Sequence, residues 1–86
     1  MIKVVYLGKL ADAAGSMESE FASPSGDLGW PDILALLDDQ VCHGLADAVS
    51  DQRVKVALNG QVLSDRERLV VRDGDEVAFL PPVSGG

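Results

Sequence analysis

The chain has 86 residues, enough for one small domain, and 47% of them are hydrophobic, a composition that supports a packed core. Its net charge of −7 disfavours nucleic acids and membranes as partners, because both carry dense negative charge. The single cysteine, Cys42, excludes an internal disulfide and a cysteine-based metal cluster, and it fits a reducing compartment.

The amino-terminal residues alternate as a strand does and do not resemble a signal sequence. No apolar run approaches the ~20 residues that span a bilayer, so we expect a cytoplasmic protein. Ile2 to Leu7 is predicted as the first strand, because it is rich in β-branched residues. Lys9 to Ala14 is predicted as a short helical turn that ends at Gly15, and Ser16 to Ala22 as a strand returning along the first.

The clearest helix is predicted to begin near Trp30. Pro31 suits the first turn, where a missing N–H does no harm, and Asp32 suits the positive end of the helix dipole. The apolar side chains repeat on one helical face that we expect to cover a sheet: Trp30, Ile33, Leu34, Leu37 and Val41. A weaker, short helix is predicted around Leu45 to Val49.

The second half of the chain is predicted to be mostly strands. Val54 to Leu58 alternates, Asn59-Gly60 is a strong signal for a two-residue hairpin turn, and Gln61 to Leu63 returns as a short strand. Ser64 to Arg68 is a charged connection. Leu69 to Val71 follows it and is expected to anchor it in the core.

The last strand is predicted over Asp75 to Leu80, after a tight turn at Asp73-Gly74. Val77 and Phe79 share one face of this strand. Ala78 and Leu80 share the other. Strands before and after one main helix, with no repeat or internal linker, predict an α+β domain in which a helix covers a sheet.

Reactive side chains do not converge in the sequence. His43 and Cys42 are neighbours at a helix end and point about 100° apart, so a surface histidine and a buried or half-buried cysteine are favoured over a nucleophilic pair. The acidic pairs Asp38-Asp39 and Asp75-Glu76 diverge in the same way, so neither a general acid–base pair nor a metal site is expected. No phosphate-binding, dinucleotide-binding or serine-hydrolase motif occurs.

The distinctive stretch is the carboxy-terminal one, Pro81-Pro82-Val83-Ser84-Gly85-Gly86. The prolines favour a stiff, extended exit from the last strand, and the glycines leave a slim end that carries a carboxylate. Fully extended, the six residues span roughly 20 Å, enough to enter a partner's pocket. The same composition is also that of an ordinary linker.

Residues Asp73 to Gly86 resemble the carboxy-terminus of the small subunits of molybdopterin synthase, which are ubiquitin-like sulfur carriers related to the thiamine-pathway carriers. Ile2 to Leu7, Trp30 to Leu37 and Val56 to Gly60 also fit that family. The resemblance implies a β-grasp fold, with a mixed sheet of about five strands covered by one main helix. It divides the chain into a domain, residues 1–80, and a flexible tail, residues 81–86.

The resemblance also implies a function without catalysis or a bound cofactor. An E1-like adenylyltransferase would use ATP to adenylate the carboxylate of Gly86, and a sulfur donor protein would supply the sulfur for a thiocarboxylate. The tail, with Gly85 and Gly86 at its tip, would then enter the large subunit and give sulfur to a pyranopterin precursor. Two small and two large subunits typically assemble. Because Gly86 is the last residue, no processing protease is expected.

An apolar strip on the second faces of the first and last strands is predicted to bind the large subunit and the activating enzyme. Its members are Val5, Leu7, Ala78, Leu80, Pro81, Pro82, Val83 and Ser84. The alternative is that loops or the second helix cover this strip. The alternatives for function are a sulfur carrier for thiamine, cysteine or tRNA thiolation, a ubiquitin-like modifier of lysines, and an interaction module with an idle tail.

Overall fold

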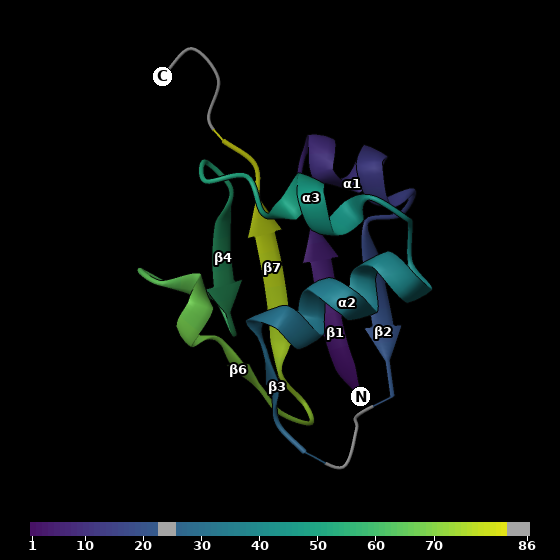
Figure 1. Ribbon diagram of the computed structural model, residues 1–86. Helices are drawn as coiled ribbons and strands as arrows, with labels where there is room; N and C mark the ends of the chain where they lie inside the picture. Colours follow the sequence, from purple (N-terminus) through teal and green to yellow (C-terminus); the bar gives the residue numbers. More distant parts are fainter. Residues whose placement is uncertain (23–25, 83–86) are drawn as a thin grey trace.

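The structure is a computed structural model and describes residues 1–22 and 26–82. Along the chain the elements are β1 (Ile2–Tyr6), α1 (Lys9–Ala14), β2 (Glu18–Phe21), β3 (Leu28–Gly29), α2 (Trp30–Gln40), α3 (Leu45–Val49), β4 (Lys55–Leu58), β5 (Gln61–Val62), the 3₁₀ helix η1 (Arg66–Arg68), β6 (Val70–Val71) and β7 (Glu76–Leu80). Figure 1 shows α2 and α3 lying across the same face of the main sheet.

The main sheet has five strands in the order β2-β1-β7-β4-β5. β1 and β7 are parallel at its centre, with Val4 opposite Val77, and the other neighbouring strands are antiparallel. The predicted mixed sheet of about five strands with one main covering helix is therefore confirmed. The strand that begins the domain lies beside the strand that leads to the tail.

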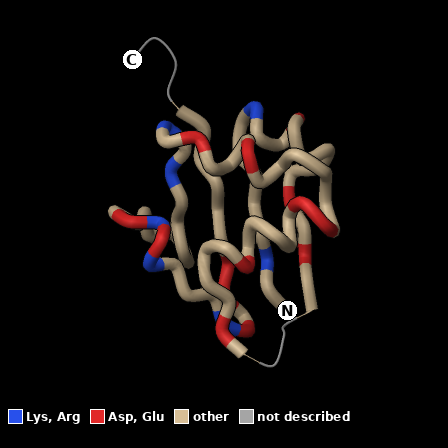
Figure 2. The backbone as a smooth tube through the Cα atoms, viewed as in Figure 1, with Lys and Arg blue, Asp and Glu red and all other residues tan. Residues whose placement is uncertain are grey.

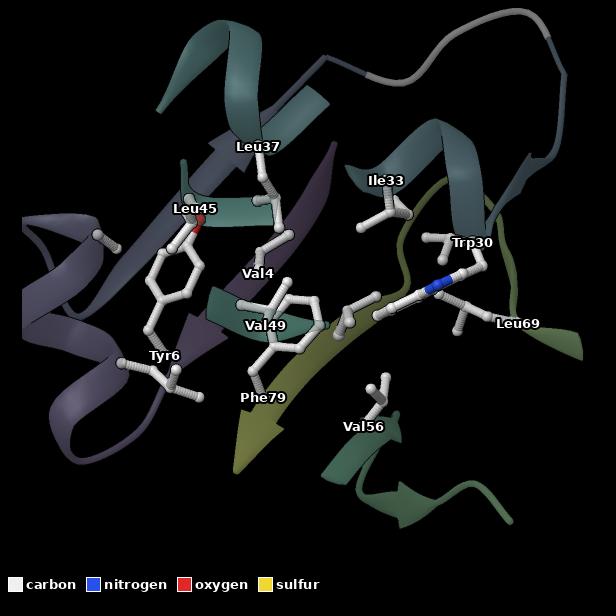
Figure 3. Packing of buried hydrophobic residues seen from close by; sticks show 14 of the residues in the cluster. Val4, Tyr6, Trp30, Ile33, Leu37, Leu45, Val49, Val56, Leu69 and Phe79 are labelled. Atoms are coloured by element: carbon white, nitrogen blue, oxygen red, sulfur yellow. The ribbon is translucent and has the colours of Figure 1, made fainter. Parts of the chain in front are cut away.

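The core lies between this sheet and the helices, and Phe79 is at its centre (Figure 3). The Phe79 ring stacks on Tyr6, with ring centroids 6.4 Å apart, and packs at a tilt against Trp30, at 6.2 Å. Ile33 and Leu37 of α2 are fully buried above it. Alternation along β1 and β7 sends these apolar side chains to the helix-covered face, as the sequence predicts.

The start of α2 follows the predicted pattern. Gly29 is the N-cap, Pro31 lies in the first turn, and the carboxylate of Asp32 accepts a hydrogen bond from the Gly29 N–H at 2.8 Å. This bond satisfies a donor that the helix itself cannot pair, and the negative charge suits the positive end of the helix dipole.

A second, two-stranded sheet was not predicted. β3 and β6 pair antiparallel, with Leu28 opposite Val71 and Gly29 opposite Val70. Two-residue strands carry too little alternation for their pairing to be recognised in a sequence. The expectation that Leu69 to Val71 all enter the core is wrong for Val70, which is 42% exposed, because neighbouring strand residues point to opposite faces.

The short helix α3 is held at both ends by side chains from other elements. A carboxylate oxygen of Asp38 accepts hydrogen bonds from the backbone N–H groups of Gly44 and Ala46, at 3.1 and 2.9 Å. At the other end the guanidinium of Arg66 donates to the backbone carbonyls of Ser50 and Asp51. These contacts matter because a five-residue helix is unstable by itself.

Arg66 also lies over the Trp30 ring, 5.1 Å from its centroid, so one side chain joins η1 to both α2 and α3. We expect Arg66→Ala to lower the free energy of unfolding by about 2 kcal/mol, the range of charge-assisted hydrogen bonds. Arg68→Ala is the control, since that side chain is exposed and is expected to matter by no more than about 0.5 kcal/mol. Denaturant unfolding checks both, and equal stabilities of the two variants would contradict the bridging role of Arg66.

Candidate functional site

The predicted site residues fall into two groups. Val83, Ser84, Gly85 and Gly86 lie outside the described residues. The others are described and lie together, around the end of β7 and on the face of the main sheet that is opposite the helices: Val5, Leu7, Ala78, Leu80, Pro81 and Pro82.

Two apolar rows cross this open face. The first row follows the strand register and consists of Val5, Ala78, Ala57 and Val62. The second contains Leu7 and Leu80, with Lys55 opposite Leu80 on β4. The β1–β7 pairing extends to this level, because the Leu7 N–H donates to the carbonyl of Phe79 at 3.1 Å. Leu7 is 40% exposed and Val62 is 53% exposed.

The helices do not cover these rows. The buried residues of all three helices pack in the single core on the opposite face of the sheet. Val5, Ala78, Leu80 and Pro81 are half-buried, Pro82 is exposed, and Ala57 in the middle of the first row is buried. Among the described residues, therefore, the second helix does not cover the strip, and an apolar surface of this kind is typical of an interaction site.

Ala57 and Val62 were missed by the sequence analysis. The signal was present, because the Asn59-Gly60 turn fixes the register of β4 and β5 and the alternation of β4 then places Ala57 on the face of Ala78. Assigning a face to every strand, and not only to the first and last, would have found both residues.

Charged residues are spread along the chain, and Figure 2 colours their positions on the backbone. Some of them border the apolar rows at the end far from the tail. Glu20 and Glu76 lie on either side of Lys3 in the register. The Lys3 ammonium is 3.1 Å from a carboxylate oxygen of Glu18, and the hydrogen bond to Glu18 raises the pKa of Lys3. The open face thus passes from a charged border, through an apolar middle, to the residues where the tail begins.

Pro81 packs against Gly8 in the turn between β1 and α1. A Cβ atom on Gly8 would lie 2.8 Å from Cγ of Pro81, closer than real Cβ contacts allow. Gly8 also has φ of +56°, a backbone conformation that residues other than glycine rarely adopt. The absence of a side chain at Gly8 therefore makes room for the proline.

A groove of about 660 Å³ lies beside Pro81 and Pro82, on the helix side of the tail. Its apolar lining comes from α1, α3 and the residue before β4: Leu10, Ala13, Ala48 and Val54. Its rim carries Lys9 and the ion pair of Arg53 with Asp51, whose Nη2 and Oδ2 atoms are 3.1 Å apart.

The described residues do not bring together groups for catalysis or metal binding. Residues 1–22 and 26–82 contain no cluster of three or more His, Cys, Asp or Glu side chains placed to hold a metal ion. His43 is exposed, as expected, but the expectation of a buried or half-buried Cys42 is wrong, because its thiol is exposed just beyond α2. In the same part of the chain, no helix has the length and apolar character needed to cross a membrane.

The comparison with protein families decides the relationship. The model of the ThiS family matches residues 4–86, almost the whole chain. The chain belongs to the ThiS family. This match includes the carboxy-terminal residues on which the sequence-based resemblance was founded.

Relatives of known name agree with this assignment. The chain is 36% identical to a molybdopterin synthase sulfur carrier subunit of Chlamydomonas reinhardtii, over 99% of this chain and 98% of the relative. It is 33% identical to the molybdopterin synthase sulfur carrier subunit of Escherichia coli (strain K12), over the full length of both. The predicted resemblance to the ubiquitin-like sulfur carriers is confirmed.

Among solved structures, SAMP1 from Haloferax volcanii matches with a TM-score of 0.71 and 26% identity, over 99% of this chain and 98% of that one. This likeness confirms the β-grasp fold. The relatives from Chlamydomonas and Escherichia coli are named as carrier subunits and not as enzymes, which fits a chain whose described residues hold no catalytic cluster.

The ion pair on the rim of the groove should be visible in a titration. The side-chain hydrogen bond from Arg53, followed by that from its backbone N–H, lowers the pKa of Asp51 to about 2. Because the folded-state pKa is depressed, the contribution of this pair to stability is present above the ordinary Asp pKa and is lost as the pH falls toward 2.

We expect Arg53→Met to raise the pKa of Asp51 partway to its ordinary value, because the backbone N–H of residue 53 would still donate. A carboxyl chemical-shift titration measures this pKa. Arg68→Met is the control and should leave it unchanged. A pKa that is the same with and without the Arg53 guanidinium would contradict the geometry of the pair.

Proposed function

We propose that this protein carries sulfur on its carboxy-terminal carboxylate for molybdopterin synthase. The observation that carries the proposal is the end-to-end match to relatives named as the sulfur carrier subunit of that enzyme. The match spans the Gly85-Gly86 end as well as the domain. The absence of a catalytic cluster among the described residues is consistent with a chain that delivers a group while its partners supply the chemistry.

The proposed chemistry uses only the Gly86 carboxylate of this chain. An E1-like adenylyltransferase joins that carboxylate to the α-phosphate of ATP, which releases pyrophosphate and leaves an acyl-adenylate. Sulfur at the sulfide level, supplied by a sulfur donor protein, attacks the acyl carbon, displaces AMP and yields the thiocarboxylate. In the large subunit this sulfur is transferred to a pyranopterin precursor, and water restores the Gly86 carboxylate. Water must be kept from the acyl-adenylate, and a narrow tunnel that does so admits glycine most readily.

The open sheet face is the proposed docking surface for the large subunit and the activating enzyme. It presents Val5, Leu7, Ala78 and Leu80 next to the tail, and the structure adds the exposed Val62, which continues the same row beyond the buried Ala57. A partner bound here holds the start of the tail at a fixed place, so the remaining residues need only reach inward. The assembly proposed is a heterotetramer of two carriers and two large subunits, in the cytoplasm.

A second candidate function is that of a ubiquitin-like modifier joined to lysines. The likeness to SAMP1, a small archaeal modifier protein, favours this reading. The two functions share the activated Gly86 and differ in the acceptor, which is sulfur for the carrier and an amine for the modifier. Carriers for thiamine, cysteine or tRNA thiolation would share the first step too.

Intact mass measurement tests the proposal. After incubation with the activating enzyme, ATP and the sulfur donor, we expect a mass gain equal to the exchange of one oxygen for sulfur. Gly86→Ala should reduce this gain strongly, since a methyl group is added at the narrowest point, whereas Gly26→Ala, with open space around it, should not. Conjugates of higher mass would favour the modifier instead. An unchanged mass together with no affinity for a large subunit would overturn both readings.

The docking surface is tested with charged substitutions. Leu7→Glu and Leu80→Glu should each weaken binding of the large subunit by about tenfold or more, because a buried, unpaired carboxylate is costly. Val70→Glu is a matched control: Val70 is 42% exposed against 40% for Leu7, but it lies on the small second sheet. Calorimetric titration measures the affinities. Equal binding by all three variants would place the interface elsewhere.

A further inference from the structure

We propose that Gly8 is a positioning residue for the tail, and that its lack of a side chain sets the direction in which the chain leaves the sheet. The importance of this direction for sulfur transfer rests on the proposed function. The contact itself does not, since it is a property of the described residues Gly8 and Pro81.

β7 and β1 are hydrogen-bonded to each other almost to the point where the tail begins. The Leu7 N–H donates to the Phe79 carbonyl at 3.1 Å, so the parallel ladder is intact one residue before Gly8 and two before Pro81. On the β1 side the pairing of β7 ends there, and on the other side Leu80 is still paired with Lys55 of β4. The next contact along the exit is the one between Gly8 and the Pro81 ring.

The contact between Gly8 and Pro81 leaves little space for a side chain at position 8. The Pro81 ring has Cγ 2.8 Å and Cδ 3.7 Å from the place where a Cβ atom of residue 8 would be. Proline fixes its own φ, so a change of ring pucker can shift Cγ, but the ring as a whole moves only with the main chain. We infer that a side chain at position 8 pushes on the ring and so changes the direction in which the chain continues from Pro81.

Gly8 is itself held in place at the start of α1. It is the N-cap of α1, with φ of 56° and ψ of −133°, and its carbonyl accepts a hydrogen bond from the Ala11 N–H at 3.1 Å. Leu10 anchors α1 in the core. Moving the turn would disturb the start of α1. Gly8 is therefore a fixed surface against which Pro81 packs.

A double-mutant cycle separates this contact from backbone strain. Gly8→Ala adds both a clash with Pro81 and an unfavourable φ, whereas in Gly8→Ala/Pro81→Ala the Cγ atom is absent and only the strain remains. Gly15→Ala is the control for loss of a glycine at positive φ, since nothing lies within 4 Å of its Cβ position. All variants are made in the full chain.

The direction of the tail is measured without any enzyme. Nitroxide labels are placed on the native, exposed Cys42 and on Ser84→Cys, and pulsed electron–electron double resonance gives the distance between them. Gly8→Ala should shift the distance distribution when Pro81 is present and shift it far less in combination with Pro81→Ala. Gly15→Ala should leave it unchanged. Equal shifts with and without the proline at position 81, or no shift at all, would overturn the proposal.

The consequence for sulfur transfer is read with the activating enzyme. Gly8→Ala should lower the turnover number for thiocarboxylate formation by about tenfold, because a misplacement of about 1 Å can cost up to ~100-fold. Its KM should change less, since the open face is intact, and the double variant should recover part of the turnover. If the parent chain does not form the thiocarboxylate at all, the proposed function is wrong. The distance measurement still tests whether Gly8 positions the tail. If Gly8→Ala turns over like the parent, the positioning role fails alone.

Discussion

The parallel pairing of β1 with β7 is the constraint on which the rest of the structure depends. It joins Val4 to Val77, which are far apart in the sequence, and puts the first and last strands side by side in the middle of the sheet. Tyr6 and Phe79 then stack on the helix-covered face, and Trp30 brings the start of α2 to the same point. Without this pairing the remaining elements have no common surface on which to pack.

The same two strands also make the open face. Because successive strand residues alternate, Val77 and Phe79 hold the core while Ala78 and Leu80 point to the other side. Stability and the proposed recognition therefore use different residues of one strand. A protein of this size has a small core, and this division lets the proposed docking surface coexist with the core without competing for the same side chains.

The sequence predicted the long elements well, because hydrophobic periodicity is strong over five or more residues. The first and last strands, α2 and the Asn59-Gly60 hairpin were all found. Pairings between distant two-residue strands, such as Leu28 with Val71, have no local signal. Side chains that act at a distance were also missed, and Asp38, which begins α3 from the end of α2, is the clearest case.

The site divides in the same way. Its apolar strip could be predicted from the alternation of the strands. The contact of Pro81 with Gly8 could not be predicted, because glycine occurs in turns for several different structural reasons. The place of Ala57 in the first apolar row depends on the register of β4 and β5, which the hairpin turn fixes.

The place of β7 in the chain has a consequence for biosynthesis. The central strand of the sheet is made almost last, so β1 has no partner on that side until residues 76–80 have left the ribosome. Such non-local pairing delays folding until nearly the whole domain is available. A chain cut short before this strand would lack the middle of its sheet and would be open to proteolysis. Only chains that include β7 can complete this sheet. Chains that end before β7 would therefore not accumulate as folded competitors for the proposed partners.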